Sequence, residues 1–170
     1  RTFASVFLGF DHFPKGSREW TFFRRLSAMD YVSVYPFLLE VFARHRNSPE
    51  ILHQILQDIE SFLVRRMICQ LNTRGYGKLF VDLLGAFSQE GGAPHERVRQ
   101  FLLAGDAETT RWPDDEEFRA AWEKFPIYHV LVRRRVIMIL EALENHLHDP
   151  KTEKLEFLDK LTVEHLMPRQ

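Results

Sequence analysis

The chain has 170 residues, of which 45% are hydrophobic and 28% charged, so it can form one folded core and is neither disordered nor fibrous. Its formal net charge of −1 excludes a strong overall attraction to nucleic acid, and any DNA contact must come from local patches or from other parts of a larger protein. The single cysteine, Cys69, excludes an internal disulfide, fits a cytoplasmic location and is expected to be a buried, unreactive thiol. No apolar run reaches the roughly 20 residues of a membrane span.

The first half of the chain predicts helices over 17–28, 34–44 and 48–69. The start of the third is marked by Ser48 as the cap, Pro49 at the first helical position and Glu50 near the positive end of the helix dipole. Apolar residues along this helix recur at spacings that predict a core-facing stripe: Ile51, Leu52, Ile55, Ile59, Phe62, Leu63 and Met67. We expect it to be the central helix of the domain.

The second half predicts helices over 78–87, 94–103 and 114–125, followed by one long helix from about 127 to 146. Gly105 is expected to end the second of these, and Asp114 to cap the third, with Glu117 at the capping-box spacing. The long helix carries a predicted apolar ridge: Val136, Ile139, Leu140, Leu143 and Leu147. The fold class predicted for 1–150 is therefore an all-α, bundle-like domain of several helices. Four aromatic residues are expected near its edges: Tyr31, Tyr35, Trp112 and Trp122.

The last twenty residues, 151–170, have a different pattern. A charged stretch over 151–160 leads to a β-prone triplet at 161–163, which would place Glu164 and His165 at the end of a short strand. Pro168 would then prevent further strand pairing. From the residues alone, Glu164 and His165 are a polar pair at a strand end.

Three segments together resemble one family. The stretch from Val163 to Gln170 resembles the "(I/V)-E-H-(I/L)-x-P-Q" start of the His-Me finger (HNH-like) nuclease domain of GmrSD-type, modification-dependent restriction endonucleases. Residues 59–69 resemble the "I-E-x-(Y/F)-L-V-R-R-x-I-C" helix of the same proteins, and residues 112–118 resemble their "(F/W)-P-x-D-x-E-F" helix start. The resemblance runs from about residue 35 to residue 170.

The resemblance implies that His165 is a general base that activates water, with Glu164 and Pro168 as supporting motif residues. It also implies a divalent ion, Mg or Mn, held by residues expected after Gln170, with no metal ligand in this chain. The parent protein would be a cytoplasmic hydrolase of bacterial phage defence that cleaves DNA and carries an N-terminal nucleotide-hydrolysing domain. Because the chain begins without Met and stops within the motif, we expect an inactive fragment whose remaining nuclease domain lies downstream.

The alternative is a non-catalytic helical module that binds other proteins, a second copy of itself or nucleic acid. Arg133 to Arg135 span about 200° of a helix, so two are expected in solvent and one partly inward, with phosphate contact as the other interpretation. Arg65 and Arg66 lie among aliphatic residues, which favours structural pairing with a Glu or a helix C-terminus over nucleic-acid contact. His146 and His148 are two residues apart, which does not suit a metal pair on a helix.

Overall fold

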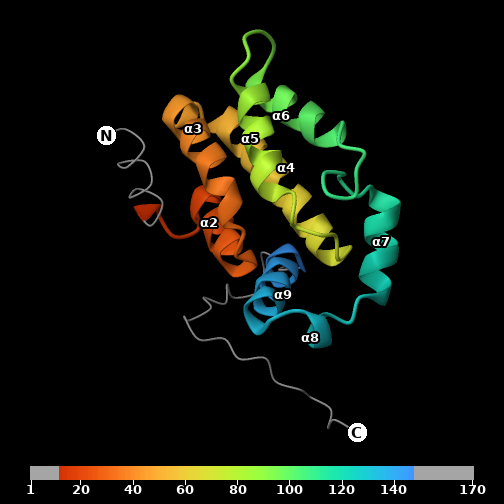
Figure 1. Ribbon diagram of the computed structural model, residues 1–170. Coiled ribbons are helices and arrows are strands. Elements are labelled where there is room, and N and C mark those ends of the chain that lie inside the picture. Colours follow the sequence, from red (N-terminus) through yellow and green to blue (C-terminus); the bar gives the residue numbers. More distant parts are fainter. Residues whose placement is uncertain (1–11, 148–170) are drawn as a thin grey trace, which may run out of the picture. The chain divides into compact units, whose positions relative to one another are not determined.

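The computed structural model describes residues 12–147, and within that range it contains eight α-helices, one 3-10 helix and no strand (Figure 1). The elements are α2 (Arg18–Met29), η2 (Val32–Val34), α3 (Tyr35–His45), α4 (Pro49–Ile68), α5 (Tyr76–Phe87), α6 (Pro94–Leu103), α7 (Asp115–Lys124), α8 (Ile127–Val130) and α9 (Arg133–Leu147). The all-α prediction is confirmed, whereas the predicted strand at 161–163 lies outside the described residues. The chain divides into two units after Phe125, and each is described by itself.

In the first unit, α4 is the central helix, as predicted. It packs against α2, α3, α6 and α7, while α5 packs against α3 and α6 (Figure 1). Every member of the predicted stripe except the half-buried Ile51 is buried, and Ile59 has no exposed surface. The surrounding core is aromatic and includes Phe22, Phe37, Phe62, Phe80 and Phe87. The four aromatic residues expected near the edges are all half-buried.

Ion pairs join α2 to α4 beside this core. Glu60 of α4 accepts from Arg18 at 2.6 Å and also from Arg25. Glu19, the residue after Arg18 on α2, contacts His53 of α4 at 2.8 Å. The side chain of Glu60 is only 12% exposed, and the two arginines supply opposite charge to a carboxylate that is largely shielded from water.

The predicted helix starts are confirmed to within two residues, but the caps differ in detail. Ser17 is extended, with ψ of 160°, and its hydroxyl accepts the Trp20 amide at 3.1 Å. Ser48 has ψ of 72°, and its side chain makes no capping hydrogen bond. The expectation that the Ser48 hydroxyl caps α4 is therefore wrong, and its backbone carbonyl instead accepts the Leu52 amide at 3.0 Å. A serine cap needs the extended backbone that Ser17 has and Ser48 lacks.

The second unit corrects the prediction of one long helix over 127–146. Leu131 is extended, with ψ of 140°, and separates α8 from α9. It is buried, and the carbonyl of Val132 then accepts the amides of Arg135 at 2.9 Å and Val136 at 3.3 Å to start α9. No glycine or proline marks the break, although β-branched Val130 and Val132 flank it and favour extended backbone.

The predicted apolar ridge of α9 is only partly buried. Val136 and Ile139 are buried, whereas Leu140, Leu143 and Leu147 are exposed. None of the helices over residues 12–147 is long and apolar enough to cross a membrane.

Candidate functional site

The predicted general base, His165, and its supporting motif residues, Glu164 and Pro168, lie outside the described residues. The structure does describe an earlier segment of the chain, which runs from Trp112 into α7. Two arginines of α4, Arg65 and Arg66, donate hydrogen bonds to backbone carbonyls on either side of Trp112. We call Arg65 and Arg66 the arginine clamp.

Arg66 is fully buried, with 0% of its surface exposed. Its Nε donates to the Tyr76 hydroxyl at 3.1 Å, and its Nη1 donates to the Arg111 carbonyl at 2.6 Å. Its Nη2 donates to the carbonyls of Asn72 at 2.7 Å and Glu108 at 3.1 Å. These bonds engage four of the five N–H groups of a guanidinium. They tie the last turn of α4 to the two loops before α5 and before α7.

These four acceptors of Arg66 are neutral oxygens, and two aromatic rings also lie beside its guanidinium group. The guanidinium carbon lies 5.3 Å from the centre of the Phe62 ring and 5.4 Å from that of Tyr76, distances at which ring quadrupoles attract a cation. Structural engagement of Arg66 was the favoured expectation, and it is found, although with loop carbonyls rather than with a Glu. In this state Arg66 offers no surface to nucleic acid.

Arg65 makes the second set of contacts of the arginine clamp. Its Nη1 donates to the Pro113 carbonyl at 3.0 Å, and its Nη2 pairs with the Asp115 carboxylate. The guanidinium also lies 5.1 Å from the centre of the Phe118 ring. The hydrogen bond from Arg65 lowers the pKa of Asp115, so that carboxyl stays ionised. Arg65 thus holds Pro113, two residues before α7, and the first residue of α7 against α4.

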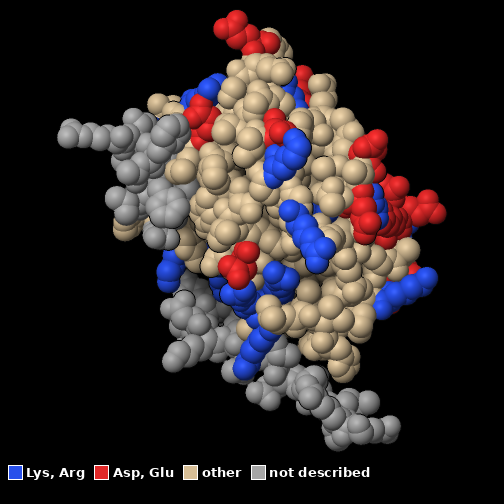
Figure 2. All heavy atoms as spheres, in the orientation of Figure 1, with Lys and Arg blue, Asp and Glu red and all other residues tan. Residues whose placement is uncertain are grey.

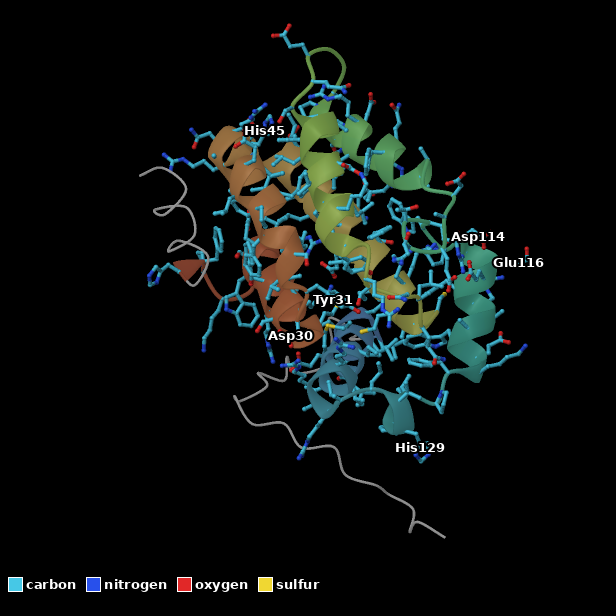
Figure 3. The ribbon with its side chains drawn as sticks, viewed as in Figure 1. Asp30, Tyr31, His45, Asp114, Glu116 and His129 are labelled. Carbon is cyan, nitrogen blue, oxygen red and sulfur yellow. The ribbon has the colours of Figure 1, made fainter. Side chains whose placement is uncertain are left out.

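The start of α7 is capped as predicted. The Asp114 carboxylate accepts a hydrogen bond from the Glu117 amide at 2.8 Å (Figure 3). The Glu117 side chain does not complete the predicted reciprocal box, since it pairs with Arg111, at 2.7 Å from Nη2 to Oε1. Exposed acidic residues therefore gather where α7 begins (Figure 2): Asp106, Glu108, Asp114, Asp115 and Glu116. Capping and the helix dipole account for this acidic run.

The loop before α7 is closely folded. A Cβ on Gly105 would lie 2.6 Å from the Thr110 carbonyl oxygen, and one on Gly75 would lie 3.0 Å from the Thr109 Cβ. Gly105 follows the end of α6 as predicted, but its φ is not positive, since the glycines with positive φ among the described residues are Gly16, Gly91 and Gly92. The reason for a glycine at position 105 is close backbone approach, which brings the Arg66 acceptors into place.

One buried carboxylate and its exposed cation partner were not identified from the sequence. Asp58 of α4 is buried and accepts from Arg99 of α6 at 2.5 Å, and Arg99 also lies 5.6 Å from the centre of the Trp112 ring. Burial raises the pKa of Asp58, while Arg99 opposes that rise. The one signal available was the position of Asp58 directly beside Ile59 of the stripe.

The remaining candidates separate into surface and structural groups. Arg133 and Arg134 are exposed and Arg135 is half-buried, so the expectation of two solvated arginines and one partly inward is confirmed. Cys69 is half-buried rather than buried, and burial raises the pKa of its thiol. Between residues 12 and 147, no three His, Cys, Asp or Glu side chains group so that they could hold a metal ion. His146 is exposed on α9, and His148 lies outside the described residues.

The C-terminal part of the chain resembles a known protein family. Residues 112–170 match the model of the GmrSD restriction endonucleases, C-terminal domain. The predicted resemblance to GmrSD-type restriction endonucleases is confirmed over these residues, while its earlier part, which includes residues 59–69, stays a prediction. No curated protein and no solved structure matches the chain. The GmrSD match begins at Trp112, directly after the last carbonyl that Arg66 holds and directly before the one that Arg65 holds. The chain is therefore similar to this C-terminal domain over residues 112–170.

Proposed function

We propose that the chain is part of a cytoplasmic DNA endonuclease of bacterial phage defence, in which His165 is the general base of phosphodiester hydrolysis. The observation that carries the proposal is the family match, which includes Glu164, His165 and Pro168. An imidazole with an ordinary pKa near 6.5 is largely neutral at cytoplasmic pH, so its free nitrogen can accept a proton from water. Glu164 and Pro168 support the position of that imidazole in the motif.

The family resemblance also implies a divalent ion, Mg or Mn, which would stabilise negative charge on the attacked phosphate. The described residues do not fit such an ion, because they group no suitable set of ligands. We therefore assign no metal ligand among residues 12–147.

The described helices contribute support rather than chemistry in this proposal. The arginine clamp and the Asp114 cap hold the beginning of the matched segment on the central helix, where Arg65 binds the Pro113 carbonyl. A fixed starting point matters because catalytic groups must be held within a fraction of an ångström of a productive position. The acidic surface at the start of α7 repels phosphates, so we place DNA on other faces of the protein.

The proposal is tested with the full-length protein and His165→Ala. Cleavage is measured on plasmid DNA with unmodified and modified bases, in Mg²⁺ and in Mn²⁺, together with the melting temperature of each variant. Loss of a general base should lower the cleavage rate about 10²–10⁴-fold and leave the melting temperature and any nucleotide hydrolysis unchanged. His146→Ala, which removes an exposed histidine from α9, is the matched control and should cleave at the full rate.

Two results would contradict the proposal. A stable His165→Ala protein with full activity would remove the general-base role from this motif. A wild-type protein that binds DNA but cleaves none of these substrates in either metal would favour the alternative of a nucleic-acid-binding helical module.

A further inference from the structure

The helix α7 differs from the other helices described over residues 12–147. Every other helix of ten or more residues in this range has buried side chains, whereas α7 has none. Its two aromatic residues, Phe118 and Trp122, are half-buried. Within the first unit, α4 is the helix that α7 packs against (Figure 1). A helix of ten residues is at best marginally stable by itself in water, so α7 depends on its contacts with α4 and with the loop before it.

The polar contacts that hold α7 in place are two ion pairs near the surface. Arg65 of α4 pairs with Asp115, whose side chain is 83% exposed. The Arg65 guanidinium also lies 5.1 Å from the centre of the Phe118 ring. Arg111, in the loop before α7, pairs with Glu117, and their side chains are 32% and 36% exposed. Water and salt screen ion pairs at such positions, so these contacts stabilise α7 only weakly.

The chain at both ends of α7 is held by burial. On the N-terminal side, Arg66 donates to the Arg111 carbonyl at 2.6 Å, and Pro113 is buried. On the C-terminal side, Phe125 is 8% exposed. We call residues 114–124, which run between these buried positions, the strap. The strap therefore connects two fixed points but contributes no buried side chain to the core.

We propose that the strap opens and closes on α4 while the core of the first unit stays folded. The structure shows the closed state. Opening breaks the pair between Arg65 and Asp115 and exposes the two aromatic residues, but it leaves the four hydrogen bonds of Arg66 in place. Segments with few buried apolar contacts open at a free energy well below that of global unfolding. Arg65 is then a catch that sets how often the strap is closed, and Arg66 is a fixed anchor.

The strap lies at the beginning of the segment that matches the restriction endonuclease domain. That match begins at Trp112, so α7 is the first helix of the matched segment. Opening of the strap lets the chain rearrange there without disturbing the central helix. Opening needs no role for His165 in catalysis, so the strap and the proposed function can fail independently.

Hydrogen exchange of the full-length protein, followed by mass spectrometry, tests whether the strap opens. The amides of residues 118–124 are the ones to follow, because the first amides of a helix lack acceptors within it. The matched comparison is α6, which also has ten residues but buries Val98 and Leu102. Protection factors over 118–124 should be at least about 100-fold lower than those over 98–103 of α6 and those in the middle of α4.

Three variants test the role of the catch. Arg65→Gln should lower protection in the strap by about a further 10-fold and leave α4 and α6 unchanged. Asp115→Asn alters the same pair from the α7 side and should act in the same direction, with a smaller effect. Arg44→Gln removes an arginine that pairs with Glu40 within α3, and this control should leave the strap unchanged. Raising the salt concentration from about 0.1 to about 1 M should lower protection of the strap more in wild type than in Arg65→Gln.

Equal protection over 118–124 and in α6 would overturn the proposal, since α7 would then open only when the core unfolds. If Arg65→Gln lowers protection equally in α4, α6 and the strap, Arg65 stabilises the core and is no catch. A strap that exchanges at the wild-type rate in both Arg65→Gln and Asp115→Asn would also overturn the role of Arg65. The result expected is a loss of protection that is confined to the strap in both of these variants and absent in Arg44→Gln.

Discussion

Arg66 of α4 and Arg133 of α9 each belong to a short run of arginines that apolar residues flank, yet Arg66 is fully buried and Arg133 is exposed. Arg66 lies in the last turn of its helix, where the dipole favours a cation, and two loops bring carbonyls to it. Arg133 lies in a first turn, where the dipole disfavours it. The comparison shows that the helix end and the loops around it, rather than the local residue pattern, decide whether a helical arginine supports the fold or faces outward.

The largest expected effect follows from removing the buried arginine. Arg66→Ala leaves a cavity in the core and four oxygens without their donor, so the free energy of unfolding should fall by about 3–5 kcal/mol. Arg133→Ala, the same change at the exposed position, should alter it by less than about 0.5 kcal/mol. Urea denaturation of both variants makes the comparison.

Arg66→Lys sharpens that result. Lysine keeps the charge but donates from a single nitrogen, so it cannot reach acceptors in the four directions that Arg66 serves. Its stability should lie between those of wild type and Arg66→Ala. Similar midpoints for Arg66→Ala and Arg133→Ala would show that the clamp contributes nothing and that the contrast between the two arginines is only one of exposure.

An effect of intermediate size is expected from Asp114, a negatively charged residue at the start of α7. Asp114→Ala removes the carboxylate that accepts the Glu117 amide, and it should destabilise the protein by about 1 kcal/mol. Asp114→Asn keeps an acceptor oxygen and should lose much less. If both variants lose the same amount, as measured by thermal unfolding, the charge of Asp114 matters and its cap does not.

Much of the fold could be predicted because local patterns encode it. The stripe that includes Ile59 follows the helical period, and Asp114 stands three residues before Glu117 at the spacing of a cap. Other features depend on residues distant in sequence. The acceptors of Arg66 are backbone carbonyls, which every residue has, and the need for Gly105 arises from contact with Thr110. No sequence pattern distinguishes such positions.

The candidate site also has features that could be predicted from the sequence and features that could not. The matched family and its motif could be found from residue types at fixed spacing, such as Glu164, His165 and Pro168. The placement of Arg133 in the first turn of α9 could not be predicted, because it depends on the extended Leu131, and neither glycine nor proline marks that break. The periodic pattern over 127–146 fits a continuous helix equally well, and burial of Leu131 decides between the two.

The smallest expected effect tests the unfavourable placement of the α9 arginines directly. Arg133→Gln removes one cation from the positive end of the helix, so it should raise the free energy of unfolding by about 0.3–1 kcal/mol at low ionic strength. Salt screens this repulsion, so the gain should shrink toward zero in about 1 M salt, where the Debye length is about 3 Å. Arg46→Gln, an exposed arginine just after α3, should show no such gain. The two variants are compared by urea denaturation at both salt concentrations. A loss of stability in Arg133→Gln that salt does not change would mean that Arg133 is held by packing, and α9 would then resemble α4 in how it uses its arginines.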